Sequence, residues 1–264
     1  MTGTSEKWSD LAARVGSAIA MIVIGLGGIA MGGPIFHVLV SIICGLMAWE
    51  LVGMLNPDRP RAKIQMGLLV GGATLAAIYL PMGFALPVLL APALVGFGQL
   101  EKHRTIFMCF TVMIMLAGFG LVQIRDGYGF GWMMWLVLVV VITDVFGYFA
   151  GRAIGGPKFW PRVSPKKTWS GTAAGWVGAA IVGYLFSVNT GIGMQLVGVS
   201  IAVSMASQMG DMAESGMKRR VGAKDSSNLI PGHGGLLDRF DGMLGAALFL
   251  LIIGQFLTIT PTLN

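Results

Sequence analysis

Long apolar runs alternate with short polar segments along almost the whole chain. A helix needs about 20 mostly apolar residues to cross a bilayer. Candidate spans lie at residues 15–33, 35–55, 66–80, 83–98, 105–123, 130–150, 170–188, 192–212 and 240–260. The third and fourth runs are short and are separated only by the break at Pro81–Met82–Gly83, so they are either two spans or one broken hairpin or re-entrant pair. The pattern predicts an all-α, polytopic integral membrane protein with about nine transmembrane helices.

The composition supports lipid as the main solvent for this chain. Hydrophobic residues make up 55% of it and charged residues only 11%, whereas a soluble domain carries about 25% charged residues. The two cysteines, Cys44 and Cys109, both lie inside apolar runs, so they offer neither a disulfide framework nor a zinc site. The first apolar run is somewhat long for a signal peptide and is interpreted as an uncleaved helix.

The positions of the basic residues predict the orientation in the membrane. If there are nine spans and the N-terminus is cytosolic, all but one of the 18 Lys and Arg residues fall on the cytosolic side. The exception is Arg125, which stands next to Asp126. This asymmetry follows the positive-inside rule. It also accounts for the net charge of +6 through topology, so no nucleic-acid partner is expected.

Two polar stretches on the cytosolic side, residues 151–169 and 211–239, are long enough to hold a functional site. Asp211 closes the eighth apolar run, and Asp238 and Asp241 open the ninth on one helix face. Carboxylates that converge need a cation between them. Hard oxygen ligands beside many Lys and Arg residues favour Mg²⁺ carrying a polyphosphate.

Cations and a turn without side-chain bulk lie between these acids. The Pro231–Gly235 turn and the N-terminus of the ninth helix are expected to offer backbone N–H groups to an anion, and His233 to orient a phosphate or move a proton. The alternative is a solvated basic loop that binds anionic headgroups, which explains the cations but not the acids. The basic residues in question are Lys218, Arg219, Arg220, Lys224 and Arg239.

Three further features carry weaker signals. Asp144 interrupts a strongly apolar run and is interpreted as functional, with pairing to Arg152 as the alternative. Glu50, late in the second run, is interpreted as structural, either reaching the interface or pairing with Arg59. The stretch 164–171 holds two lysines, hydroxyls and a Trp, which suit either a phosphate grip at headgroup depth or a topological anchor.

The segment from Ser215 to Asp241 resembles the signature of phosphatidate cytidylyltransferases, with every fixed element at its expected spacing. Those elements are Ser215, Lys218-Arg219, Lys224-Asp225, Leu229 through Gly235, and Asp238-Arg239-x-Asp241. Residues 164–171, and Asp144 with Gly151-Arg152, resemble two further family blocks. Residues 131–264 are therefore expected to form the catalytic transmembrane region, and residues 1–130 match only as hydrophobic helices. Ser170 departs from the family pattern, because many members have an acidic residue at this position. Val145 and Phe146 also depart from it, because small residues are usual there.

The resemblance implies a nucleotidyltransferase of phospholipid biosynthesis that converts CTP and phosphatidic acid into CDP-diacylglycerol and pyrophosphate. By analogy, Asp211 and Asp238 organise Mg²⁺, with a second cation left open, and Asp225 and Asp241 support them. The resemblance also suggests a homodimer. The compact chain suggests a bacterial inner membrane, with the site facing the cytosol. The residues expected to bind substrate phosphates or complete the wall of the site are Asp144, Ser164, Lys167, Thr168, Lys218, Arg219, Lys224, His233 and Arg239.

Two other functions compete with this interpretation. A CTP-dependent lipid kinase would share the metal and phosphate chemistry, but it needs a base for its alcohol and leaves no CMP in the product. A transporter or channel would place polar groups near the midplane of several spans, whereas here they gather at one face. The Asp-rich motif of CDP-alcohol phosphotransferases is not found in the chain.

Overall fold

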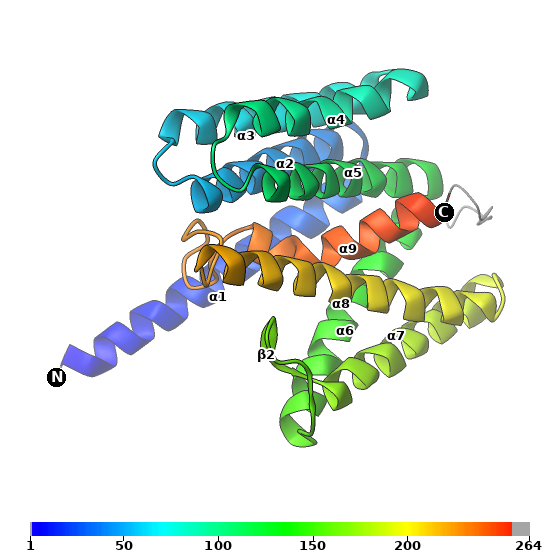
Figure 1. Ribbon diagram of the computed structural model, residues 1–264. Coiled ribbons are helices and arrows are strands. Elements are labelled where there is room, and N and C mark those ends of the chain that lie inside the picture. Colours follow the sequence, from blue (N-terminus) through cyan, green and yellow to red (C-terminus); the bar gives the residue numbers. More distant parts are fainter. Residues whose placement is uncertain (1, 255–264) are drawn as a thin grey trace. The chain divides into compact units, whose positions relative to one another are not determined.

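The computed structural model describes residues 2–254, and in this part each predicted apolar run corresponds to one α-helix (Figure 1). The short third and fourth runs form two separate helices that break at Leu80–Pro81. The last six residues of the ninth run lie outside the described residues. The helices are α1 (Thr2–Met31), α2 (Gly33–Leu55), α3 (Pro60–Tyr79), α4 (Met82–Gln99), α5 (Arg104–Tyr128), α6 (Phe130–Ala153), α7 (Trp169–Thr190), α8 (Gln195–Val221) and α9 (Leu237–Ile253).

Seven of these helices are long and apolar enough to cross a membrane, namely α1, α2, α3, α5, α6, α7 and α8. Many large apolar side chains on them are exposed, including Val23 at 63% and Leu68 at 72%. A soluble protein rarely leaves so much apolar surface in water. The chain is therefore an all-α, multi-pass membrane protein, apart from one short hairpin.

The chain folds into two compact units that are interleaved along the sequence. The first comprises Met1–Met115 and Val221–Phe240, and the second comprises Leu116–Arg220 and Asp241–Asn264. The expected division between residues 1–130 and the catalytic region 131–264 is a functional one, and it stays a prediction.

In the first unit, α2, α3 and α4 pack in sequence order (Figure 1). Glycines set the distance between α2 and α3, because a Cβ added to Gly45 would lie 2.7 Å from the carbonyl oxygen of Gly67. Such close approach favours association of helices in lipid through van der Waals contact.

In the second unit, small residues and buried hydroxyls join α6, α7, α8 and α9. The indole of Trp135 donates to the hydroxyl of Ser200 at 3.0 Å. On the same two helices, α6 and α8, Thr143 donates to Ser204 at 2.8 Å. Helices α8 and α9 approach at Gly245, where an added Cβ would lie 3.0 Å from the Cα of Gly210.

Residues 151–169 contain a β-hairpin that the hydrophobic pattern did not predict. Its strands are β1 (Lys158–Trp160) and β2 (Ser164–Thr168), and they pair antiparallel with Lys158 opposite Thr168. Thr168 then caps α7, since its hydroxyl accepts from the backbone N–H of Gly171 at 3.2 Å. The hairpin thus holds the Lys-rich segment against the start of a spanning helix.

The expected end of the eighth helix near residue 212 is wrong, because α8 continues to Val221. Ala, Glu, Met, Lys and Arg dominate this extension, and all favour helix. Basic residues in the last turn also interact well with the helix dipole. Gly222 follows with φ of 72°, a conformation that ends helices. The basic group Lys218–Arg220 therefore lies on a helix and not in a loop.

Candidate active site

The second unit contains a cavity of about 370 Å³ at the junction of α6, the β-hairpin, α7 and α8. It brings together two carboxylates, Asp144 on α6 and Asp211 on α8, with cationic side chains from α6 and β2. Its lining residues are Thr143, Asp144, Gly147, Tyr148, Gly151, Arg152, Lys166, Lys167, Thr168, Gly171, Thr172, Gln208 and Asp211. A cavity that has both acidic and basic side chains is suited to bind a polyanion together with its counter-cation.

Asp211 is held by two neighbours. The ammonium of Lys167 forms an ion pair with its Oδ2, and Ser215, one turn later on α8, donates to its Oδ1 at 3.2 Å. Both members of the ion pair are partly exposed, at 25% and 27% of their side-chain surface. The pair therefore remains accessible from the cavity.

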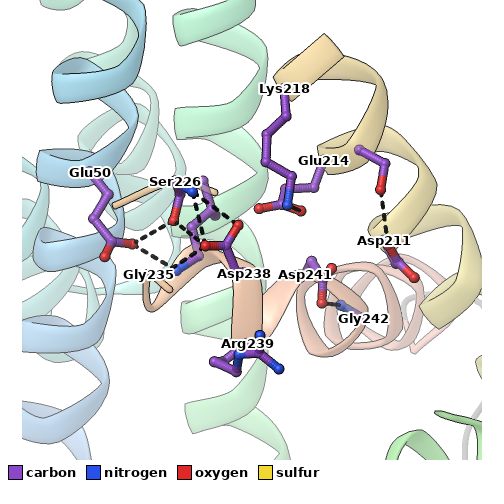
Figure 2. A network of polar contacts seen from close by, with 12 residues as sticks. Glu50, Asp211, Glu214, Lys218, Ser226, Gly235, Asp238, Arg239, Asp241 and Gly242 are labelled. Carbon is purple, nitrogen blue, oxygen red and sulfur yellow. Dashed lines mark hydrogen bonds and ion pairs between the residues drawn. The ribbon is translucent and has the colours of Figure 1, made fainter. Parts of the chain in front are cut away.

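A second ion pair lies further along α8. Lys218 contacts Glu214 at 2.5 Å, and only 1% of the Glu214 side chain is exposed (Figure 2). Asp241, at the start of α9, is within electrostatic range of Asp144, Asp211 and Lys218. The second unit thus places Asp241 near Asp211, whereas the expected convergence with Asp238 stays a prediction, because Asp238 belongs to the first unit.

The cavity includes four of the predicted site residues and omits others. Asp144, Lys167, Thr168 and Asp211 line it, whereas Ser164, Lys218 and Arg219, although described, are not among its lining residues. Sequence reasoning did not single out Gln208, whose amide accepts from the indole of Trp176 at 3.0 Å. It also passed over Tyr148, which accepts from Arg152 at 2.9 Å. A polar residue inside an apolar run was the available signal for Gln208.

The signature turn, defined here as residues 226–236 of the first unit, folds around the carboxylate of Asp238. That carboxylate accepts from the backbone N–H of Ser226 at 2.9 Å and of Gly235 at 2.8 Å (Figure 2). The hydroxyl of Ser226 donates to it at 3.0 Å. Asp238 therefore closes the turn onto the first residues of α9.

Glu50 of α2 binds the same turn. Its carboxylate accepts from the backbone N–H of Leu236 at 2.8 Å and of Leu237 at 2.7 Å. The structural interpretation of Glu50 agrees with these contacts, but both expected forms of it are wrong. Glu50 is 0% exposed and so does not reach the interface, and Arg59 forms its ion pair with Glu101.

These contacts also correct the expected use of the α9 N-terminus. The N–H groups of residues 235–237 already donate to Asp238 and Glu50, so they are not presented to a substrate anion. Helix N-termini attract negative charge from any source. Here the protein's own carboxylates supply that charge.

His233 lies at the tip of the turn with partners on both sides. Its Nδ1 is 2.8 Å from the hydroxyl of Ser17 on α1. Its carbonyl oxygen accepts from Nε and Nη2 of Arg239, at 3.0 and 2.8 Å. The imidazole is thus oriented by a residue from the first helix, which no sequence motif indicated.

The donor chemistry fits a hard divalent cation. The cavity offers carboxylates from Asp144 and Asp211, and Mg²⁺ prefers such oxygen ligands. In this structure the Lys167 ammonium provides positive charge at Asp211. Neither unit, within residues 2–254, brings three His, Cys, Asp or Glu side chains into a metal-binding group. Asp211 and Asp238 belong to different units, and their shared role stays a prediction.

Comparisons with known proteins place these features in a family. A model described as the cytidylyltransferase family matches residues 12–257. A phosphatidate cytidylyltransferase of Staphylococcus aureus (strain COL) is 30% identical over 249 residues, covering 88% of this chain and 94% of the relative. Another, of Brucella abortus (strain 2308), is 47% identical over 133 residues, covering 49% of this chain and 48% of the relative. The match thus spans about half the length of the Brucella relative.

Proposed function

This chain belongs to the cytidylyltransferase family, and on that premise we propose that it transfers CMP from CTP to phosphatidic acid, giving CDP-diacylglycerol and pyrophosphate. The observation that carries the proposal is the cavity that joins Asp144 and Asp211 to Lys167 and Arg152 in a membrane protein. A nucleoside triphosphate and a lipid phosphate are both polyanions, and such a cavity neutralises them while its surroundings accept acyl chains.

The reaction needs positioning and charge stabilisation more than acid–base chemistry. A phosphate oxygen of phosphatidic acid attacks the α-phosphorus of CTP, and a new P–O bond forms. The bond from that phosphorus to the bridging oxygen of the β-phosphate breaks, and pyrophosphate leaves with the electron pair. Since the attacking phosphate is already anionic at neutral pH, no protein base is required. Lys167 and Arg152 stabilise charge on the phosphoryl oxygens.

The proposal includes Mg²⁺ held by Asp211 and Asp238, with a second cation left open. When bound, the metal supplies positive charge to the polyphosphate. Asp225 and Asp241 are proposed to support these carboxylates. Beyond the cavity, the proposed phosphate-binding residues are Ser164, Lys218, Arg219, Lys224, His233 and Arg239.

We also propose nine spans, a cytosolic N-terminus and a cytosolic site in a bacterial inner membrane, and a homodimer. The charge asymmetry of the loops supports this topology. In a variant without Cys44 and Cys109, a cysteine at Lys158 should resist an impermeant thiol reagent in intact cells, and one at Asp126 should react. The reverse labelling would contradict the orientation.

The activity is tested with purified protein, phosphatidic acid and CTP, with and without Mg²⁺. CTP labelled at the α-phosphate should transfer its label to a lipid-extractable product, and only when Mg²⁺ is present. Transfer of γ-phosphate label to an added lipid alcohol would replace the proposal with a lipid kinase. If folded protein moves neither label, the cytidylyltransferase proposal is overturned.

A further inference from the structure

Glu50 is a buried carboxylate of α2 that contacts the signature turn, although the two are far apart in the sequence. It is 0% exposed and lies near the end of α2, among apolar residues. Its Oε1 accepts from the hydroxyl of Ser227 at 2.6 Å and from the N–H of Leu236 at 2.8 Å. Its Oε2 accepts from the N–H of Leu237 at 2.7 Å.

A buried carboxylate is costly unless hydrogen bonds and positive charge compensate for its lost hydration. The hydrogen bonds that Glu50 accepts come from the signature turn and the first residue of α9. The positive end of the α9 dipole adds to it. The buried carboxylate of Glu50 therefore keeps its hydrogen bonds only while the turn keeps this conformation, and the turn is in the same way tied to α2.

Glu50 and Asp238 act on the turn together. The hydroxyl of Ser226 lies between them, 3.0 Å from Asp238 and 3.4 Å from Glu50, as Figure 2 shows. Gly235 is tightly enclosed by Ser226 and Glu50, because a Cβ added there would overlap the hydroxyl of Ser226 and lie 2.7 Å from Oε1 of Glu50. The close approach of Glu50 thus explains why the second position after His233 is a glycine.

The other side of the turn carries His233, whose carbonyl oxygen is bound by Arg239 of α9, and the proposed function assigns both residues to phosphate binding. Both are fixed through backbone atoms of the same turn, since Arg239 donates to the carbonyl oxygen of His233. Any change in the path of residues 233–236 displaces these two side chains. Glu50 has no exposed surface, so any effect that it has on substrate phosphates passes through the turn.

We infer that Glu50 is a positioning residue of the nucleotidyl-transfer site, holding the signature turn so that His233 and Arg239 meet the substrate phosphates. The inference rests on the proposed function. It assigns a role in the site to α2, one of the N-terminal helices. A misplacement of about 1 Å in a positioning group is sufficient to slow catalysis about 100-fold.

The test compares Glu50→Gln, Glu50→Asp and Ser227→Ala with wild type, using Glu101→Gln as the matched control on an exposed carboxylate of the same unit. Gln keeps the shape of Glu50 but offers its amide nitrogen to N–H donors. We expect kcat to fall 10- to 100-fold in Glu50→Gln and less in Glu50→Asp, with KM for phosphatidic acid within twofold of wild type. Ser227→Ala should lose activity in the same direction, and adding it to Glu50→Gln should have little further effect.

A second readout does not depend on activity. Trypsin should cleave after Lys224 or Arg239 faster in Glu50→Gln than in wild type or Glu101→Gln, while the thermal midpoint changes by only a few degrees. If wild type transfers no CMP, the proposed function fails, and this cleavage still tests the hold of Glu50 on the turn. If the Glu50→Gln variant has the same kcat and the same cleavage rate as wild type, the inference is overturned. The inference is also overturned if Glu50→Gln fails to fold while Ser227→Ala keeps wild-type activity, since that outcome indicates a general role of Glu50 in folding.

Discussion

Lys167, the fourth residue of β2, forms an ion pair with Asp211, the seventeenth residue of α8. The two residues are 44 positions apart in the sequence, and each belongs to a different polar stretch. Their pairing makes one cavity out of two segments that the sequence offered as separate candidates. It also identifies Lys167 as a hairpin lysine that binds Asp211.

Replacing Lys167 with Met should lower kcat/KM about 100- to 1000-fold, because a cation aimed at developing charge contributes that much in other active sites. Lys167→Arg keeps the charge and should lose less. The matched control is Lys158→Met, an exposed lysine on the neighbouring strand. Equal losses in Lys167→Met and the control would show that any change in the hairpin is harmful and would remove Lys167 from the site.

Chelation of divalent metal with EDTA should abolish CMP transfer, and added Mg²⁺ should restore it. In Asp211→Asn the weaker oxygen donor should raise the Mg²⁺ concentration for half-maximal rate at least tenfold. A titration of rate against free Mg²⁺ measures both effects. An unchanged Mg²⁺ requirement in a folded Asp211→Asn protein would contradict the assignment of Asp211 as a metal ligand.

Asp238→Asn should destabilise the signature turn and reduce turnover more than tenfold. The new amide nitrogen faces the N–H groups of Ser226 and Gly235, so hydrogen bonds to a charged acceptor are lost. Each such bond contributes about 1.5–3 kcal/mol. Thermal unfolding in detergent and the CMP-transfer rate provide the measurements, with Asp58→Asn on the exposed Lys102 ion pair as control. Near-normal activity would exclude Asp238 from both proposed roles.

Gly245→Ala should lower stability by about 1–3 kcal/mol, the usual cost of overpacking. The added methyl would meet the carbonyl oxygen of Ala206 and lie 3.0 Å from the Cα of Gly210. Gly198→Ala is the control on α8, because an added Cβ there has nothing within 4 Å. It should be neutral or slightly stabilising, since Ala favours helix over Gly. Equal thermal midpoints for the two variants would show that the α8–α9 crossing tolerates a methyl group.

The sequence by itself determined the class of the protein and the place of almost every helix. Apolar runs of spanning length have few alternatives in lipid, because only a helix or a closed barrel satisfies the backbone there. The break at Pro81 and the family signature were equally visible, since both depend on local residue identity. The end of α8 was not predicted correctly, because residues 213–221 are polar yet favour helix.

Only the tertiary structure decided which polar residues meet. Side-chain contacts over long sequence distances, such as Glu50 with Leu237 or Ser17 with His233, leave no periodic signal in a single sequence. The same applies to the α9 N-terminus, which was expected to bind a substrate anion and instead binds two carboxylates of the protein. Local sequence fixes the backbone donors, but the burial of Glu50 by tertiary packing determines what those donors bind.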